Sequence, residues 1–258
     1  MHESLLISSE GRLRRLTLNR PDKRNALNIA LCRELVATLG EAAEDPGVGA
    51  ILLDAQGAHF CAGMDLNEVL EADPEETLRL HLNLFSAGTR LRKPMLTVVQ
   101  GAALSGGLGL ALNAHIVVAA SDAKFGLTET RIGLWPYVIF QAIAAATGAR
   151  KATELALTAR ILSAEEALRL GIVDFIVEPE GLAQFSLRLA NELAEASADA
   201  VAEGLSFIQQ SRGLDTRDAL EAAAGFRREV LASPDFREGV QAFREKRKPV
   251  WPSHRRRE

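Results

Sequence analysis

The sequence predicts an α/β protein with a largely parallel sheet and a helical C-terminal segment. Three short runs, residues 50–53, 95–99 and 116–120, are almost wholly apolar and alternate with segments of helical pattern. Such runs are typical of parallel strands that are covered on both faces. Toward the C-terminus only helical patterns remain. We therefore expect an α/β core over residues 1–195 and a helical segment over residues 196–258.

The first elements follow from short local signals. Residues 5–7 and 13–18 read as two strands around the turn Glu10-Gly11. Asn28 is a suitable cap for a helix that runs to about Glu44, where Asp45-Pro46-Gly47 ends it.

The later elements carry clearer caps. Asp73-Pro74 followed by two glutamates predicts the start of a helix, and Ser105-Gly106-Gly107 leads into a helix over residues 108–113. Ser163 with Glu166 three residues later forms a capping box. The last strand is expected over residues 172–177, and the C-terminal helices are expected to break near Ser197, Gly213 and Ser233-Pro234.

The composition excludes several classes of protein. Of the 258 residues, 47% are hydrophobic and 25% are charged, and the formal net charge of −4 gives no sign of nucleic-acid binding. Cys32 and Cys61 are too few for a disulfide framework and fit a reducing compartment. The sequence shows neither a signal-peptide pattern nor an apolar run of about 18 residues. We expect a cytoplasmic protein with no membrane or nucleic-acid partner.

A glycine-rich segment, residues 101–109, follows a predicted buried strand and opens a helix. Free N–H groups at the start of a helix bind negative charge, although tight packing alone also explains such glycines. The dinucleotide and phosphate-loop patterns each lack one residue here. Ala103 to Gly107 nearly matches a nucleophile elbow centred on Ser105, which leaves a serine hydrolase as an alternative. That enzyme requires a later histidine, and only His115 and His254 follow.

A second glycine-containing segment, residues 57–66, also follows a buried strand and is expected at the same sheet edge. One backbone N–H from each segment would then converge on one oxygen, as in an oxyanion hole. We expect Asp65 to cap the next helix and His59 to be a surface loop residue.

Several motifs along the chain occur in a specific order and spacing. They are Asn19-Arg20-Pro21, Asn25-Ala26-Leu27, Phe60 to Leu66, Lys93-Pro94, Val99-Gln100-Gly101, Gly106-Gly107, Ala123 to Gly126, Glu129, Gly133-Leu134 and Ala242 to Pro249. Together they resemble the crotonase superfamily, also called the enoyl-CoA hydratase/isomerase family, over nearly the whole chain. The resemblance implies a core of ββα units wound into a spiral, and an enzyme that acts on acyl-CoA thioesters.

The resemblance also implies roles for particular residues. The backbone N–H groups of Met64 and Gly106 would stabilise the thioester enolate. Candidate CoA-binding residues lie in two segments and near the C-terminus: Lys23, Arg24, Ala26, Ala62, Asp65, Leu66, Phe243 and Lys246. Phe243 and Lys246 are either contacts across a trimer interface or solvated helix residues. A homotrimer or hexamer is expected, and CoA enters as part of the substrate, so no separate cofactor and no metal is expected.

The catalytic acids limit the reaction. Hydratases of the family carry two glutamates, and the corresponding positions here are Gly109 and Glu129; a third acid found in dienoyl isomerases corresponds to Tyr137. A single base suffices to move a double bond, whereas hydration usually divides its proton transfers between two carboxylates. We therefore hypothesise that Glu129 catalyses Δ3-to-Δ2 enoyl-CoA isomerisation, with a pKa raised by apolar neighbours.

Other interpretations of the site stay open. Hydration by Glu129, alone or with Glu68 or Glu71, is one alternative, and an acyl-CoA-binding protein without activity is another. Trp135 and Tyr137 are expected to line the acyl pocket or to pack in the core.

Overall fold

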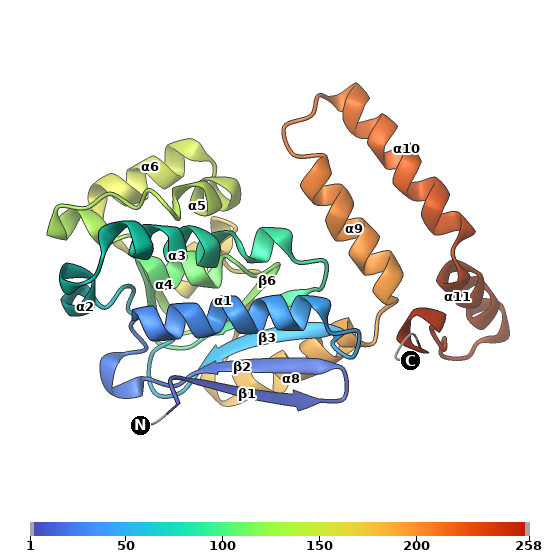
Figure 1. Ribbon diagram of the computed structural model, residues 1–258, viewed down its shortest axis with the longest axis horizontal. Helices are drawn as coiled ribbons and strands as arrows, with labels where there is room; N and C mark the ends of the chain where they lie inside the picture. The colour runs from blue at the N-terminus through green and yellow to red at the C-terminus, as the bar shows by residue number, and fades with distance from the viewer. Residues whose placement is uncertain (1–2, 256–258) are drawn as a thin grey trace.

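The computed structural model describes residues 3–255, and its core is a six-stranded sheet in the order β1-β2-β3-β4-β6-β9 (Figure 1). β1 pairs antiparallel with β2, and every other pair in this sheet is parallel. The predicted parallel sheet is therefore confirmed. The strands are β1 (Leu5–Glu10), β2 (Leu13–Leu18), β3 (Ala50–Ala55), β4 (Met95–Val99), β6 (Ile116–Ala120) and β9 (Phe175–Val177).

A second, three-stranded sheet was not expected from the sequence. It consists of β5 (Ala102–Leu104), β7 (Lys124–Gly126) and β8 (Ile161–Ser163), with β7 in the centre. β5 follows β4 after a turn at Gly101, whose φ of 59° lies in the left-handed region that favours glycine. This turn sends the chain away from the large sheet and toward the buried helix α4 (Gly106–Ala111).

Three helices of the core begin where their caps predict: α1 (Ile29–Glu44), α3 (Pro74–Ser86) and α7 (Ala164–Arg169). The Asn28 side chain accepts from the Leu31 N–H at the start of α1 (Ile29–Glu44). Asp73 and Ser163 cap α3 and α7 in the same way. α8 packs on β3, β4 and β6, and α1 packs on α3. The other core helices are α2 (Leu66–Glu71), α3 (Pro74–Ser86), α5 (Phe140–Thr147), α6 (Ala149–Thr158), α7 (Ala164–Arg169) and α8 (Pro179–Ala194), with 3₁₀ turns at Pro21–Lys23, Gly88–Arg90 and Glu129–Ile132.

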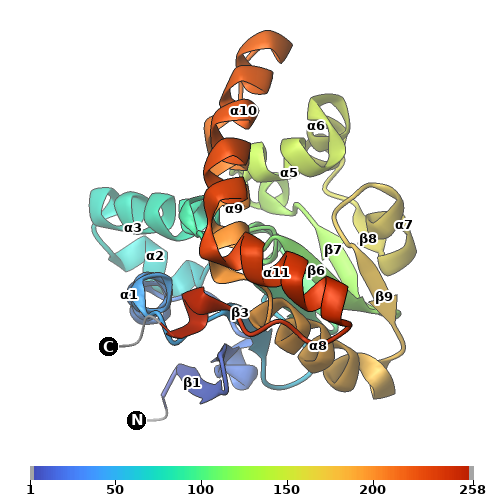
Figure 2. The ribbon, with the colours of Figure 1, turned by 90° about the vertical axis from the view of Figure 1, so that its right-hand side faces the viewer.

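The C-terminal helices extend away from the core (Figures 1 and 2). They are α9 (Ala198–Gln210), α10 (Thr216–Ala232) and α11 (Pro234–Glu245), followed by a 3₁₀ turn at Pro252–Arg255. Buried Asp235 fixes this segment, because its carboxylate accepts from the Ser197 and Ser253 hydroxyls, each at 2.6 Å.

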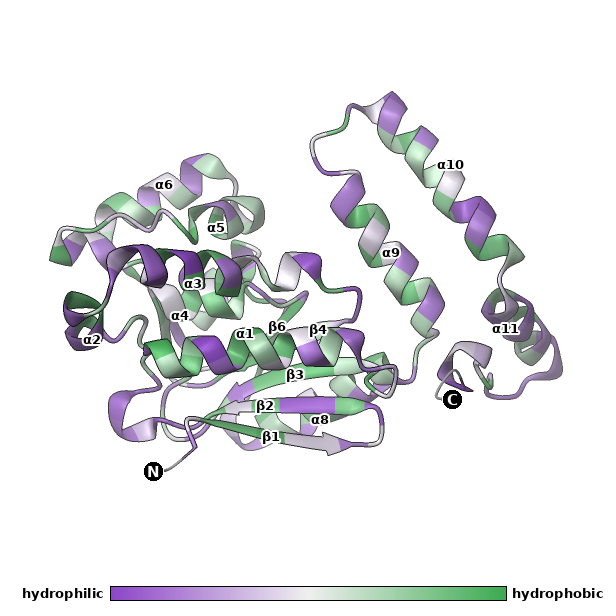
Figure 3. Cartoon of the chain, viewed as in Figure 1, coloured by the Kyte–Doolittle hydropathy of each residue, from purple (hydrophilic) through white to green (hydrophobic). Residues whose placement is uncertain are grey.

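Hydrophobic side chains are exposed along these helices, and Figure 3 shows apolar stretches on α9 and α10. They are Ile208, Leu220, Leu231, Phe236 and Phe243, with Leu214 in the α9–α10 connection.

Between residues 3 and 255, no helix has both the length and the apolar character that a membrane span requires.

Candidate active site

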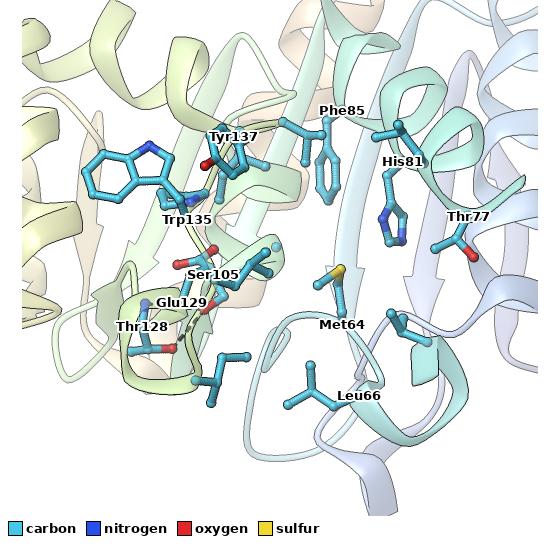
Figure 4. A pocket seen from close by; sticks show the side chains of 18 of the residues that line it. Met64, Leu66, Thr77, His81, Phe85, Ser105, Thr128, Glu129, Trp135 and Tyr137 are labelled. Carbon is cyan, nitrogen blue, oxygen red and sulfur yellow. Dashed lines mark hydrogen bonds between the residues drawn. The ribbon is translucent and has the colours of Figure 1, made fainter. Parts of the chain in front are cut away.

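A cavity of about 440 Å³ opens beside the start of α4 (Figure 4). Its walls come from the segment after β3, the inner face of α3, the turn into α4 and the segment between β7 and α5. Most of its lining is apolar. The lining residues are Ala62, Met64, Leu66, Val69, Pro74, Thr77, Leu78, His81, Phe85, Ser105, Gly106, Thr128, Glu129, Ile132, Leu134, Trp135, Pro136, Tyr137, Val138 and Ile139.

The two glycine-containing segments lie side by side at the cavity, as expected from the sequence. The Cys61 N–H donates to the Ala102 carbonyl, and the Leu104 N–H donates to the Cys61 carbonyl, each at 3.0 Å. Gly63 makes the close approach possible, because a Cβ there would stand 3.1 Å from the Leu104 carbonyl oxygen. Gly107 is more crowded still, since its Cβ would stand 2.2 Å from the Cys61 carbonyl oxygen.

Two backbone N–H groups beside this cavity are free. The Asp65 N–H donates to Leu27 and the Ser105 N–H donates to Gly126, but the N–H groups of Met64 and Gly106 have no acceptor among residues 3–255. Both residues line the cavity. These two N–H groups could both donate a hydrogen bond to an anionic oxygen bound in the cavity.

Ser105 adopts a strained backbone conformation, with φ 52° and ψ −124°. Its hydroxyl lies 2.8 Å from that of Thr128. The two histidines that follow Ser105 in the sequence are engaged elsewhere: His115 Nδ1 accepts from the Met95 N–H, and His254 Nε2 lies 3.0 Å from the Ala196 carbonyl. The arrangement therefore gives no support to a hydrolase.

Glu129 is the one carboxylate on the cavity wall within the part of the chain that the structure describes. It begins a 3₁₀ turn, its side chain is only 5% exposed, and Oε2 has no hydrogen-bond partner there. Burial raises the pKa of Glu129, although its own N–H and the Ser105 hydroxyl oppose the shift. The direction of this pKa shift is the one that the sequence predicted.

The position of the second carboxylate has no room for a side chain. A Cβ at Gly109 would stand 2.2 Å from Ile139 Cγ2 and 3.4 Å from Phe85 Cδ1. The other candidate acids lie outside the cavity wall. Glu68 Oε2 accepts from the Ile29 N–H at 3.0 Å, and Glu71 is exposed at the end of α2.

The expected acyl-pocket residues both line the cavity. Trp135 is half-buried and packs near Phe140, with ring centroids 6.1 Å apart. Tyr137 is 75% exposed, so core packing does not explain it.

The segment expected to hold CoA is hydrogen-bonded to the cavity wall. The Ala62 N–H donates to the Arg24 carbonyl at 3.0 Å, and both Lys23 and Arg24 are exposed. Ala26 is half-buried, and its carbonyl accepts from the Arg20 guanidinium.

The expectation that Asp65 caps α2 is wrong. Asp65 occupies the cap position, but its side chain makes no capping hydrogen bond. Its carboxylate instead lies 3.0 Å from Arg20, and both side chains are 18% exposed. The charge of a distant residue has overridden the local preference for capping.

Three other candidate residues lie outside the cavity wall. His59 is half-buried rather than a surface residue, and its Nδ1 has no partner within the described chain. Phe243 lies on α11 and Lys246 follows it, and neither belongs to this cavity wall.

Three polar residues of the cavity were not predicted from the sequence: Thr128, before the 3₁₀ turn at Glu129, and Thr77 and His81. Thr77 and His81 lie on α3 and are buried. Both are 6% exposed. Burial lowers the pKa of His81. Their spacing of one helical turn on a buried face was the available signal.

The parallel core and the paired turns of this α/β fold bring two free N–H groups and one buried carboxylate to a single cavity. The chain matches the family described as enoyl-CoA hydratase/isomerase over residues 9–254. A probable enoyl-CoA hydratase from Rhizobium meliloti is 36% identical over 249 residues, covering 96% of this chain and 97% of that protein.

Two further comparisons agree. The 2,3-dehydroadipyl-CoA hydratase of Escherichia coli is 33% identical over 251 residues, with 95% of this chain and 97% of that protein covered. A solved structure of an enoyl-CoA hydratase from Mycobacterium smegmatis superposes with a TM-score of 0.92 at 31% identity, covering 97% of this chain and 99% of the other. This chain therefore belongs to the enoyl-CoA hydratase/isomerase family, and the fold that the sequence resemblance implied is confirmed.

Proposed function

We propose that this protein is an enoyl-CoA isomerase that moves a double bond from the Δ3 to the Δ2 position, with Glu129 as the single acid–base group. One observation carries the proposal: Glu129 is the only carboxylate on the described cavity wall, while Ile139 fills the space beside Gly109. One base suffices for this reaction because the same carboxylate can take the proton from C2 and return it to C4.

The free N–H groups of Met64 and Gly106 would bind the thioester oxygen. Negative charge develops on that oxygen when a proton leaves C2, so these donors bind the transition state more strongly than the substrate. The strained Ser105 backbone directly precedes Gly106 and supports a role in aiming that N–H.

The proton transfer balances with Glu129 alone. The ionised carboxylate takes a proton from C2 of the 3-enoyl-CoA, and the electron pair moves through C1 onto the thioester oxygen as a dienolate. The carboxylic acid then returns the proton to C4, and the double bond forms between C2 and C3. A raised pKa helps Glu129 to retain the proton between these two steps.

Hydration is the second candidate, because the relatives from Rhizobium meliloti and Escherichia coli are named hydratases. In that reaction water adds to C3 and a proton to C2 of a 2-enoyl-CoA. Glu129 would have to serve both transfers, because Glu68 and Glu71 lie outside the cavity wall.

The remaining site residues would hold the CoA part of the substrate. Lys23 and Arg24 are exposed and form no ion pair within residues 3–255, so they are available to CoA phosphates. Ala26, Ala62, Asp65 and Leu66 belong to the two hydrogen-bonded segments that would border the CoA. CoA enters as part of the substrate, and the proposed reaction uses no further cofactor.

The C-terminal residues fit a role in a neighbouring subunit. Phe243 is 84% exposed on a helix with other exposed apolar residues, which marks an interaction surface. We propose a homotrimer or a hexamer in which Phe243 and Lys246 reach the CoA site of the adjacent subunit.

Parallel assays with 3-hexenoyl-CoA and 2-hexenoyl-CoA test the reaction, with products identified by mass. Isomerisation leaves the mass unchanged, whereas hydration adds one water, and a hydrated main product would reverse our choice. Glu129→Gln should lower turnover by about 10²–10⁴-fold while acyl-CoA binding survives. Glu71→Gln is the matched control, because it makes the same change at an exposed acid outside the cavity wall. Unchanged turnover in Glu129→Gln would remove Glu129 from the mechanism.

A further inference from the structure

Two hydroxyl side chains join the turn into α4 to the segment that carries Glu129. Ser105 Oγ lies 2.8 Å from Thr128 Oγ1 and accepts from the Thr128 N–H at 3.3 Å (Figure 4). Both residues line the cavity, and Gly106 directly follows Ser105 in the chain. Glu129 directly follows Thr128, so each hydroxyl lies one residue away from a group that the proposed chemistry uses.

This side-chain contact begins where the backbone pairing ends. β5 pairs with β7, and the Ser105 N–H still donates to the Gly126 carbonyl at 2.8 Å. In the part of the chain that the structure describes, no backbone hydrogen bond joins residues 106–111 to residues 127–132. The hydroxyl pair therefore continues the pairing by one step and ties the start of α4 to the turn that carries Glu129.

The backbone conformation of Ser105 is one that disfavours a side chain. Its φ of 52° and ψ of −124° correspond to a turn position that glycine usually occupies. Arg24, Ala159 and Lys246 also have positive φ, but they lie in the left-handed helical region, which is less restrictive. Glycine would relieve the strain at residue 105 but would lack the hydroxyl that contacts Thr128. A function of this hydroxyl accounts for serine at a strained position.

The Ser105 hydroxyl also acts on the Glu129 carboxylate. Burial raises the pKa of Glu129, and a hydrogen bond from the Ser105 side chain opposes this shift. A hydroxyl carries one hydrogen, and its oxygen accepts further hydrogen bonds. When the Thr128 hydroxyl donates to Ser105 Oγ, the Ser105 hydrogen is left for the carboxylate, and such a bond stabilises the ionised form.

We propose that Ser105 and Thr128 are positioning residues, whose hydroxyl pair holds the Glu129 carboxylate in a fixed place relative to the Gly106 N–H. This inference rests on the proposed role of Glu129 as the acid–base group and deepens it. The pair exchanges no proton with the substrate and acts only through Glu129. Such positioning matters because a small misplacement of a reacting group greatly lowers the rate.

Steady-state kinetics of variants tests the proposal, with whichever of 3-hexenoyl-CoA and 2-hexenoyl-CoA the parent converts. Ser105→Ala and Ser105→Gly both remove the hydroxyl, but only glycine suits the backbone conformation. Each should lower kcat by about 10–100-fold and change KM by less than about threefold. Thr128→Val should also lower kcat, whereas Thr128→Ser keeps the hydroxyl and should retain most of it.

Thr130→Val is the matched control for Thr128→Val. Thr130 follows Glu129 in the same 3₁₀ turn, and its hydroxyl donates to the Ala156 carbonyl at 3.2 Å. Thr130 does not line the cavity wall. The same substitution on the other side of Glu129 should therefore leave kcat unchanged.

The pH dependence separates the positioning of Glu129 from a general loss of structure. Because the Ser105 hydroxyl lowers the pKa of Glu129, Ser105→Ala should move the acid limb of the kcat/KM profile to higher pH. Thr130→Val should leave this limb in place. The cavity wall, the Glu129 turn and α6, which packs against that turn, carry these other titratable or charged side chains: His81, Tyr137, Arg131, Arg150, Lys151 and Glu154. Ser105→Ala changes none of them, so a moved limb reports on Glu129.

The possible failures are distinguishable. Full activity in Ser105→Ala, or in Ser105→Gly alone, would overturn the proposal, because the hydroxyl would then not be required. A lower kcat with an unmoved acid limb would also overturn it, as would an equal loss in Thr130→Val. Full turnover in Glu129→Gln would refute the proposed function and the positioning role together. An inactive Glu129→Gln beside a fully active Ser105→Ala would refute only the role of the hydroxyl pair.

Discussion

Replacing Gly109 with alanine tests whether Ile139 excludes a side chain at the position of the second carboxylate. The new methyl carbon would stand 2.2 Å from Ile139 Cγ2, 2.8 Å from Ile139 Cβ and 3.4 Å from Phe85 Cδ1. Because carbon atoms prefer separations of about 3.5 Å or more, the backbone at residue 109 and the Ile139 side chain would have to move apart by about 1.3 Å. Gly109 is fully enclosed in α4, so this movement disturbs the core.

The size of the effect follows from two opposing terms. Overpacking a core typically costs about 1–3 kcal/mol. Alanine in a helix interior is favoured over glycine by about 1 kcal/mol. We therefore expect Gly109→Ala to lower the free energy of unfolding by about 0–2 kcal/mol, toward the upper end because a separation of 2.2 Å from Ile139 Cγ2 is a severe overlap. Gly109→Glu should lower it further, because it also buries an unpaired carboxylate.

Urea unfolding of Gly109→Ala, Ile139→Ala and the double variant measures this effect. Ile139→Ala alone should cost about 2–5 kcal/mol, because it leaves a cavity. In that background the clash with Cγ2 is gone, so Gly109→Ala should cost about 1 kcal/mol less than it does in the parent protein. A fully additive cycle, together with Gly109→Ala as stable as the parent, would show that packing does not exclude a side chain here.

Three further predictions concern other parts of the site. Burial raises the pKa of Glu129 in the folded protein, so the parent should lose stability relative to Glu129→Gln as the pH rises above the ordinary glutamate value of 4.5. Urea unfolding at several pH values measures this difference, and equal pH profiles for the two proteins would contradict it. Arg20→Ala should lower the free energy of unfolding by about 1–3 kcal/mol and weaken acyl-CoA binding, because it leaves the mostly buried Asp65 carboxylate and the Ala26 carbonyl without their partner. Arg20→Lys is the control that keeps the charge, and full acyl-CoA affinity in Arg20→Ala would argue against this role. Phe243→Asp should reduce the molecular mass of the proposed oligomer measured by light scattering while the monomer keeps its stability. Leu168→Asp, which changes an exposed apolar residue elsewhere, should leave the mass unchanged. An unchanged mass for Phe243→Asp would place the subunit contact elsewhere.

The sequence predicted the elements whose signals are local. The strands of the large sheet are continuous apolar runs, and Asn28, Asp73 and Ser163 cap their helices as expected. The helix α4 begins at Gly106 and the strand β9 at Phe175, so two boundaries differ by two or three residues from those expected.

The second sheet could not be found in this way. Its strands have three residues each, and β7 contains a lysine and a glycine, both poor strand formers. These segments are extended because their neighbours in space pair with them, and Lys124 to Gly126 pairs with residues on both sides. Tertiary pairing of this kind leaves no periodic pattern in a short stretch of sequence.

The same difference between local signals and long-range contacts explains which site residues were predicted. The two turns and Glu129 were found through a resemblance that extends along the chain. Asp65 was misread as a cap because Arg20, its actual partner, is distant in the sequence. Thr77 and His81 were missed because their four-residue spacing on α3 marks a shared face but does not show that this face borders a cavity.

The packing around Gly109 bears directly on the choice of reaction. Ile139 and Phe85 both line the cavity and both crowd this glycine, so apolar side chains occupy the region where a second carboxylate would stand. Proton transfer between two carbons of one substrate requires a single base, and Glu129 is the one carboxylate on the described cavity wall. The contact of Ile139 with the space beside Gly109 leaves the cavity without a second acid at this position, and this one observation supports our proposal of isomerisation over hydration.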